Sequence, residues 1–513
     1  MIFNTYYLFI STIVAISLMI SIYLHFIVKK TNLALLLLLI TAFIVRLFIA
    51  SIDPFLQDWD ERFHALVAKN MMSNPFKPMM RLDPILPYKI EDWCCNHIWV
   101  HKQPLFLWQM ALSMKIFGTN EIALRLPSVV MGTISIYFVY DIAKMWLKNL
   151  DVAFFAASLC TFSYYQLELI SGRFSLEHND LAFAFYVTAS VWGFLKYNYT
   201  QDKLKWSILI GVFVGCAILN KWLTGLLVYG GWGLYLLLSK TERLKWKKWA
   251  DIGLSLLVSL IVFLPWQLYI NAQFPLETAV MHEHNNLHIF EDLGHSGSIW
   301  FHIDQMRSTY GQYLLIFLIP GLYWVLKNSE INKQITIAFF AMIIAIYSFF
   351  SIIVQTKMPA FTYPVNSLVW ILISLGIVSS FSIIVPKFRN TSILIVLIMV
   401  CIYTLKPWQI LAHRSVNNIE RNNKIENTKI YKTIDFSGEL KGRVIFNCKS
   451  FTDVELMFYQ NVNAFHWYPP QSALDSLIEK GYKFAAFKDH NDQHLPEYIY
   501  SNKDVLIIDR SIK

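Results

Sequence analysis

The chain has 513 residues, of which 56% are hydrophobic and only 15% are charged, and its mean hydropathy is +0.43. These values exclude an ordinary soluble globular protein, because apolar runs such as 33–52 are long enough to cross about 30 Å of hydrocarbon. The net charge of +9 does not indicate a nucleic-acid partner, since the basic residues lie in short loops between apolar runs. The sequence therefore predicts an integral membrane protein.

About twelve transmembrane helices are predicted, so the first 410 residues read as an all-α polytopic membrane protein. In chain order the helices are expected at 5–27, 33–52, 122–146, 150–170, 181–198, 206–220, 222–239, 250–270, 309–326, 334–354, 361–382 and 391–408. Lysines and arginines cluster in alternate loops, and the positive-inside rule places those loops in the cytoplasm. The even number of crossings leaves both termini outside.

The segment 206–239 is short for two crossings, because roughly 34 helical residues extend only about 51 Å. Basic clusters flank this segment at both ends, and a single crossing would place one of them outside. The charge pattern therefore favours two short helices that break at Asn220-Lys221.

Three outer loops, 53–121, 171–180 and 271–308, contain the polar residues that could carry chemistry. The first loop contains the adjacent carboxylates Asp60 and Glu61, which repel each other and have no role in contact with lipid. The pair therefore indicates either catalysis or cation binding at the membrane surface. Solvated loop acids are the alternative interpretation.

The composition changes after about residue 410, where polar segments alternate with short β-like runs at 442–447, 483–487 and 505–509. A helical stretch over 470–480 precedes the second run, and Gly481 follows it as a predicted C-cap. We expect residues 411–513 to form a small α/β domain outside the membrane. This segment has no Gly-rich phosphate loop, so no catalysis is assigned to it.

The six cysteines show no CxxC metal-binding spacing. Three of them fall in predicted spans, where cysteine behaves as a small hydrophobic residue. The other three, Cys94, Cys95 and Cys448, lie on the oxidising side in this topology, where a disulfide could form.

Several patterns in the outer loops resemble the polytopic GT-C glycosyltransferases that use polyprenyl-phosphate sugars. The most similar branch contains the protein O-mannosyltransferases and the lipid A aminoarabinose transferases, and the resemblance covers about residues 55–370. It rests on five runs: Asp60-Glu61-Arg62-Phe63-His64-Ala65; His101-Lys102-Gln103-Pro104-Leu105 with Trp108, Phe117-Gly118, Arg125-Leu126-Pro127-Ser128 and Gly132; Arg173 with Asp180; Leu219-Asn220-Lys221; and Glu283-His284. The chain departs from the family pattern at His101, Gln103, Phe63 and Trp222.

The resemblance implies an inverting glycosyltransferase with a GT-C fold in residues 1–410. The enzyme would move a sugar from a polyprenyl-phosphate donor to a lipid (such as lipid A) or protein acceptor at the outer face of the bacterial inner membrane. Asp60 would remove the proton from an acceptor hydroxyl, with Glu61 and Asp180 as further catalytic carboxylates. Basic side chains would stabilise the phosphate leaving group, and the residues implied are Lys102, Lys221 and Arg173.

Each of these residues also has a structural interpretation. Lys102 could snorkel to the membrane interface, and Asp180 could cap the helix that follows it. Arg173 could neutralise a nearby acid: Glu168, Glu177 or Asp180. Trp108 and Arg125 favour structural roles.

A divalent metal of the Zn²⁺ type is one expectation from the histidines of the outer loops. In the aminoarabinose branch a metal lies between the position of His101 and the Glu-His histidine, here His284. Imidazole nitrogens at both positions would suit zinc. Solvated loop histidines are the alternative, and no other cofactor is expected.

Two other classes of protein compete with a transferase. A lipid-linked sugar flippase or transporter would place ionisable residues inside its spans, whereas Arg46 and Asp141 are among the few such charges here and both lie near span ends. A membrane anchor that presents residues 411–513 to partners would not need Asp60 or Lys221. The position of the acids in outer loops favours the transferase.

Overall fold

The computed structural model describes residues 5–88, 90–91, 96–174, 177–221, 223–384, 389–449, 451–490, 493–510 and 512. The chain divides into two compact units. Unit 1 comprises Met1–Ala50, Lys102–Phe106 and Ser128–Lys406, and unit 2 comprises Ser51–His101, Leu107–Pro127 and Pro407–Lys513. The predicted disulfide concerns Cys94 and Cys95, which lie outside the described residues.

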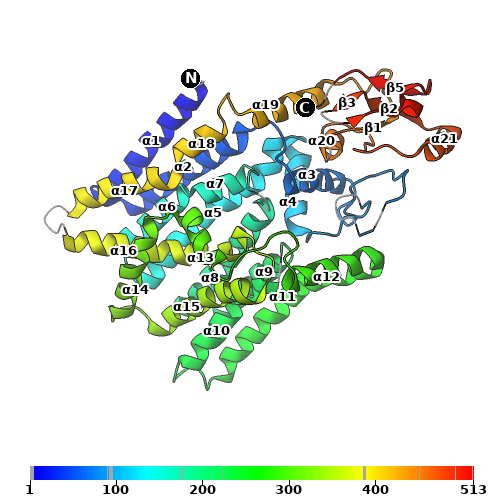
Figure 1. Cartoon of the computed structure of the whole chain (residues 1–513). Coiled ribbons are helices and arrows are strands. Elements are labelled where there is room, and N and C mark those ends of the chain that lie inside the picture. The colour runs from blue at the N-terminus through cyan, green and yellow to red at the C-terminus, as the bar shows by residue number, and fades with distance from the viewer. Residues whose placement is uncertain are drawn as a thin grey trace. The chain divides into compact units, whose positions relative to one another are not determined.

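Unit 1 is built from helices throughout its described residues (Figure 1). Helices α2 and α5 extend beyond it at one end. Its helices are α1 (Thr5–Phe26), α2 (Thr31–Ile52), α5 (Glu121–Leu147), α6 (Leu150–Thr161), α7 (Tyr164–Ile170), α8 (Glu177–Tyr199), α9 (Lys203–Ile218), η1 (Leu223–Leu226), α10 (Leu227–Leu238), α11 (Trp246–Gln273), α12 (Pro275–Phe290), α13 (Phe301–Met306), η2 (Arg307–Gly311), η3 (Leu314–Phe317), α14 (Leu318–Lys327), α15 (Lys333–Ser348), η4 (Phe349–Ile353), η5 (Pro359–Val365), α16 (Asn366–Ile384) and α17 (Arg389–Leu405).

Among the described residues, seven helices are long and apolar enough to cross a membrane. An eighth crossing is obtained if the pair Phe301–Gly311 and Leu314–Lys327, bent by 102°, counts as one span. The protein is thus an integral membrane protein. The remaining four predicted crossings coincide with α6 and α7 together, α8, α9 and α10, so the total of twelve stays a prediction.

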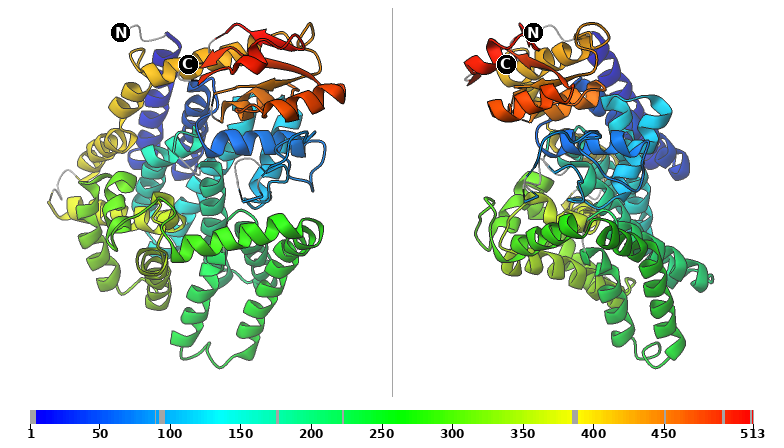
Figure 2. Two further views of the ribbon diagram at one scale, coloured as in Figure 1. Left: turned by 45° about the vertical axis from the view of Figure 1, so that its right-hand side comes forward. Right: turned by 90° about the vertical axis from the view of Figure 1, so that its right-hand side faces the viewer.

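Helix α9 ends at Ile218 and the 3₁₀ helix η1 begins at Leu223, which confirms the predicted break at Asn220-Lys221. Helices α10 and α11 then lie side by side (Figure 1, Figure 2). Lys221 lies in the short segment between these two helices.

A second break separates α6 from α7 and is stabilised by a buried arginine. Arg46 is fully buried and donates to the carbonyl oxygens of Cys160 and Thr161 at 3.1 and 3.3 Å, at the end of α6. A guanidinium at this end offsets the unsatisfied carbonyls and the partial negative charge of the helix. Gly132 makes room for it, because a Cβ there would lie 2.9 Å from Arg46 Nε.

Unit 2 contains helices and the strands of the chain. Strands lie at the three segments where the sequence predicts them, and they form a parallel sheet in the order β1-β2-β5. The elements are α3 (Asp60–Met71), α4 (Leu105–Phe117), α18 (Pro407–His413), α19 (Ile419–Thr433), β1 (Arg443–Phe446), α20 (Thr452–Tyr459), α21 (Gln471–Glu479), β2 (Lys483–Phe487), β3 (Asp489–His490), β4 (Gln493–His494), α22 (Glu497–Tyr500) and β5 (Val505–Ile508).

The sheet of unit 2 is held by a compact aromatic core. In register, Val444 pairs with Phe484, and Phe484 pairs with Val505. The rings of Phe446 and Phe484 stack at 5.2 Å, and Leu86 from the first outer loop is buried in the same cluster. Gly481 has a φ of +88°, which suits its predicted place after helix α21.

Residues 51–101 and the C-terminal segment belong to the same unit. Arg81 forms a fully buried ion pair with Asp453 at 2.7 Å. Lys69 donates to the carbonyl oxygens of Met457 and Gln460 at 2.7 and 3.1 Å. Residues 411–513 therefore pack with residues 51–101 and 107–127. Their predicted status as a domain of their own stays a prediction.

Candidate active site

Asp60 is the first residue of helix α3 in unit 2, and its exposed fraction is 8%. Trp59, directly before it, has a φ of +60°, a conformation that is costly for a bulky residue. Strained backbone of this kind concentrates at functional sites, where surrounding contacts hold it in place. Helix α3 is amphipathic, but almost all of its residues are buried.

Glu61 has a role that its sequence position does not reveal. Its two carboxylate oxygens accept from Arg125 Nε at 2.7 Å and from the terminal nitrogen Nη2 at 2.9 Å, and both side chains are fully buried. Arg125 also donates to the carbonyl oxygens of Asp53 and Phe55, each at 2.8 Å. This bidentate pair fixes the turn that precedes Asp60. It confirms the structural interpretation of Arg125.

The carboxylate of Asp53 forms a second anchor for the same turn. Arg414 contacts its Oδ2 at 3.1 Å, and Arg421 contacts its Oδ1 at 3.0 Å. Both arginines follow residue 406 in the sequence, so residues more than 350 positions apart hold this turn. Asp53 could not be recognised from the sequence, because an acid at the end of an apolar run resembles an ordinary loop residue.

In unit 1, Lys221 forms an ion pair with Asp180, and the two side chains are 7% and 2% exposed. Lys221 Nζ also lies 5.0 Å from the ring centroid of Phe361. A buried lysine that is paired with a carboxylate does not snorkel to the interface. The N-cap interpretation of Asp180 is wrong, because α8 begins at Glu177 and places Asp180 inside its first turn.

Lys102 also lies in unit 1. The segment that contains it is joined to the end of α9 by a backbone hydrogen bond. The N–H of Leu105 donates to the carbonyl oxygen of Leu219 at 3.1 Å, which ties residues 102–106 to the end of α9. Gln267 on α11 strengthens this link by donating to Gln103 Oε1 at 2.7 Å. The second and fourth sequence patterns, about 120 residues apart, are therefore joined at their backbones.

The pKa values of two histidines on α12, His284 and His288, are lowered, in part by the charges of these lysines. Burial lowers the pKa of His288 to about 4, with further lowering by His284 and by the positive charges of Lys102 and Lys221. Burial also lowers the pKa of His284, and Lys102 adds to this effect. Both imidazoles are therefore neutral at neutral pH, and the local positive charge is that of the lysines. In the sequence, nothing distinguishes His288 from the other histidines of this loop.

Arg173 is engaged by an acid, as its structural interpretation proposes. Its Nε donates to Glu168 Oε2 at 2.7 Å, and its Nη2 donates to the hydroxyl of Tyr164 at 2.6 Å. The guanidinium also lies 5.0 Å from the ring centroid of Phe174. Its role toward a donor phosphate stays a prediction.

The two predicted metal ligands lie in different units. His101 belongs to unit 2, where its ring lies 5.5 Å from that of Trp99, and His284 belongs to unit 1, 4.8 Å from the ring of His288. No group of three His, Cys, Asp or Glu side chains in the described part of the chain could hold a metal ion. The charge of Lys102 near His284 would also disfavour a cation. No step below uses a metal.

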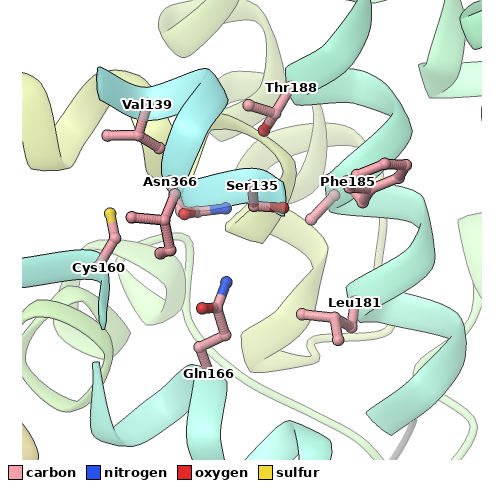
Figure 3. A pocket seen from close by; sticks show the side chains of 10 residues that line it. Ser135, Val139, Cys160, Gln166, Leu181, Phe185, Thr188 and Asn366 are labelled. Atoms are coloured by element: carbon pink, nitrogen blue, oxygen red, sulfur yellow. The ribbon is translucent and has the colours of Figure 1, made fainter. Parts of the chain in front are cut away.

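A small polar cavity of about 10 Å³ lies inside unit 1 (Figure 3). Gln166 and Ser135 point toward it, and Cys160, Thr188 and Asn366 complete its polar lining. This volume is close to the minimum of about 10–15 Å³ that one water molecule requires. It is too small for a sugar, so the cavity is not a substrate site.

A known family model matches part of the chain. The family model of dolichyl-phosphate-mannose-protein mannosyltransferases matches residues 101–269, a range that includes Lys102, Asp180 and Lys221. The predicted resemblance to the GT-C superfamily of polyprenyl-phosphate-sugar glycosyltransferases is thereby confirmed.

The chain is also similar to individual curated proteins. The undecaprenyl phosphate-alpha-4-amino-4-deoxy-L-arabinose arabinosyl transferase of Pseudomonas aeruginosa (strain UCBPP-PA14) is 25% identical over 293 residues, 53% of this chain and 50% of the relative. The chain thus matches half of that protein's length.

Two solved structures have a similar fold. ArnT from Cupriavidus metallidurans, bound to undecaprenyl phosphate, has a TM-score of 0.63 at 15% identity, over 84% of this chain and 85% of the other. The archaeal oligosaccharyltransferase AglB from Archaeoglobus fulgidus has a TM-score of 0.55 at 12% identity, over 86% and 65%. At these identities the likeness concerns the fold alone.

Proposed function

We propose that this protein is a membrane glycosyltransferase that moves a sugar from a polyprenyl-phosphate donor to a lipid or protein acceptor. The observation that carries the proposal is the basic cluster of unit 1: the segment of Lys102 is hydrogen-bonded to the end of α9 just before Lys221, and the positive charges of both lysines lower the pKa of His288. Lysines that are partly withdrawn from water stabilise phosphate charge more strongly than lysines in solvent. The family match over 101–269 and the arabinosyl transferase relatives support the same chemistry.

The proposed reaction is a direct displacement with inversion. The acceptor oxygen forms a bond to the anomeric carbon while the bond from that carbon to the phosphate oxygen breaks, and polyprenyl phosphate leaves. The proton of an acceptor hydroxyl passes to the carboxylate of Asp60. If the acceptor is itself a phosphate, there is no proton to remove, and Asp60 would orient it.

In this proposal Glu61 is a positioning residue and does not contact the substrate. Its carboxylate is occupied by Arg125, so it would hold the start of α3 and thereby the orientation of Asp60. Asp180 plays the equivalent part for Lys221, since an ion pair with a buried carboxylate fixes the direction of the ammonium group. We assign both acids to the support of neighbouring groups.

The cell location follows from charge and hydropathy. We propose about twelve crossings of the bacterial inner membrane, with the basic loops in the cytoplasm and with Asp60 and the α/β segment 411–513 outside. The seven long apolar helices and the arabinosyl transferase relatives support a location in this membrane.

Single cysteines test this topology in a background without the native cysteines. Asp83→Cys, Asn286→Cys and Ser437→Cys are expected to react with an impermeant thiol reagent in intact spheroplasts. Asp202→Cys and Lys245→Cys should react only after the membrane is opened. All five positions are exposed, so a cysteine that does not react is shielded by the membrane and not by burial in the protein. Labelling at 245 from outside would reverse the assignment of the two sides.

Lys221→Met tests the leaving-group role. Charge builds on the phosphate oxygen only as the glycosidic bond breaks, so turnover should fall by about 10²–10³-fold with a much smaller change in donor binding. Transfer assays with varied polyprenyl donor, together with direct donor binding, measure the two effects. A loss confined to donor affinity would mean that Lys221 only holds the substrate.

Two controls accompany this variant. Lys221→Met leaves Asp180 buried without its partner, which alone can destabilise a protein by about 3–5 kcal/mol. The double variant Asp180→Asn/Lys221→Met removes both charges and should restore stability without restoring turnover. Lys240→Met, at an exposed lysine of the same unit, should behave as wild type.

A further inference from the structure

A polar hollow of about 440 Å³ lies in unit 1 among helices α8, α9, α10, α11 and α15. Its volume falls within the range of about 300–1,000 Å³ that is typical of small-molecule sites. Tyr197, on its wall, and Asp180 lie at opposite ends of α8, about 26 Å apart along a helix that rises about 1.5 Å per residue. The hollow is therefore separate from the basic cluster of the candidate active site.

Two lysines of the hollow are held against one aromatic ring. Lys203 Nζ and Lys248 Nζ each lie 5.0 Å from the ring centroid of Tyr197. Lys203 is fixed there, because it also donates to the carbonyl oxygens of Tyr197 and Asn198 at the end of α8. The ring attracts each ammonium, but two like charges at one ring repel each other. This arrangement favours an anion between them.

The carboxylates nearby do not satisfy these lysines. Glu242, which also lines the hollow, accepts from Lys245 at 2.6 Å through Oε1, and its Oε2 is 3.9 Å from Lys248, beyond hydrogen-bond distance. Asp251 accepts from the hydroxyl of Tyr197 at 2.5 Å. Three lysines thus share two carboxylates, and the group keeps a net positive charge.

Helix ends add to the positive potential. Helices α9, α11 and α15 begin at Lys203, Trp246 and Lys333, and the first turn of each contributes to the hollow or directly flanks it. The N-terminal ends of helices carry partial positive charge and unsatisfied N–H groups, which suit anions. The ends of α8 and α10 also lie here with the opposite sign, and the last carbonyls of α8 are covered by Lys203.

We propose that this hollow binds a phosphate group, held between Lys203 and Lys248. A phosphate oxygen would become the nearest anion to Lys248 and would remove the repulsion between the two lysines. The hydroxyl and amide groups of the wall, such as Tyr235 and Asn332, could donate to the remaining oxygens. The phosphate could belong to an anionic phospholipid headgroup or be free in solution, and the chemistry of recognition is the same.

Native mass spectrometry of the purified full chain tests this site, with phosphatidylglycerol titrated in detergent. The double variant Lys203→Met/Lys248→Met should retain the lipid at least about tenfold more weakly, since both charge-assisted hydrogen bonds to the phosphate are lost. Lys205→Met is the matched control, because Lys205 is an exposed lysine on the same helix and does not line the hollow. It should bind as wild type does.

The variant Glu242→Gln is expected to bind the lipid more tightly, the opposite of the effect expected for the lysine variants. Removal of this carboxylate takes away the partner of Lys245 and the anion 3.9 Å from Lys248, so lipid retention should strengthen several-fold. The expected gain also keeps the proposal testable if the double lysine variant does not fold. A Glu242→Gln protein that binds no more tightly than wild type would contradict the proposal.

Competition with inorganic phosphate shows whether the bound phosphate group comes from a phospholipid headgroup or from free phosphate. If free phosphate displaces phosphatidylglycerol from the wild-type protein at millimolar concentration, the site accepts the free anion. If it does not, and the lysine variants still lose the lipid, the headgroup is the ligand. Absence of lipid and phosphate binding in the wild-type protein, or equal loss in Lys205→Met, would overturn the proposal. Sugar transfer is not the readout, so the result is independent of the proposed transferase function.

Discussion

Replacement of Asp60 by asparagine is expected to reduce sugar transfer by about 10²–10⁴-fold, the usual effect of removing a general base. Asparagine has nearly the same shape but cannot accept a proton, so helix α3 should still begin at residue 60. The Glu61–Arg125 pair, which holds the preceding turn, is unchanged in this variant. Transfer by the purified protein with a polyprenyl-phosphate donor measures the loss, and thermal unfolding in the same detergent checks the fold.

Asp83→Asn is the matched control, since Asp83 is an exposed acid in the same unit. It should retain wild-type transfer. Near-wild-type transfer by Asp60→Asn would falsify the assignment of Asp60 as the base for a hydroxyl acceptor. The same result with a phosphate acceptor would instead fit a role in orientation.

Arg125→Met is expected to lower the free energy of unfolding by about 3–5 kcal/mol, the largest stability effect we predict for a single change in unit 2. The variant leaves the carboxylate of Glu61 buried without a cation, and Arg125 no longer donates to the carbonyl oxygens of Asp53 and Phe55. Thermal and denaturant unfolding of the purified protein measure the change. Residual transfer should fall in parallel with the fraction of folded protein.

The double variant Glu61→Met/Arg125→Met distinguishes a structural pair from a catalytic acid. Removal of both charges should recover most of the lost stability, because apolar groups of similar size often replace a buried ion pair without net cost. If Glu61 only positions the turn, transfer per folded molecule should recover in part. Complete loss of transfer by a fully stable double variant would mean that Glu61 takes part in the reaction.

Local sequence predicts those features that depend on neighbouring residues. The strands near 443, 483 and 505 follow from patterns within about ten residues. The break at Asn220-Lys221 follows from the basic clusters that flank the segment 206–239. The N-cap interpretation of Asp180 was wrong because the apolar run that marks α8 begins after the helix does. Polar residues at a helix start carry no periodic signal, so the boundary was placed too late.

Partners that are distant in the sequence could not be predicted in this way. Asp53 is held by Arg414 and Arg421, and Glu61 is held by Arg125, yet each of these residues is unremarkable in its local context. The resemblance to a known family identified which residues matter. It did not distinguish an acid available for chemistry from an acid occupied by an arginine, because that difference lies in the contacts.

The sequence by itself determined that the protein is a helical membrane protein, because transfer of long apolar runs into lipid is favourable whatever the rest of the chain does. It also predicted the break at Asn220-Lys221, but not the break between α6 and α7 inside the predicted helix 150–170. Only the tertiary structure decided that Lys221 is paired with Asp180, that Lys102 is tied to the end of α9, and that two lysines meet at Tyr197. Burial and distance set the electrostatic environment of a charged group, and both arise only when segments that are remote in the sequence pack together.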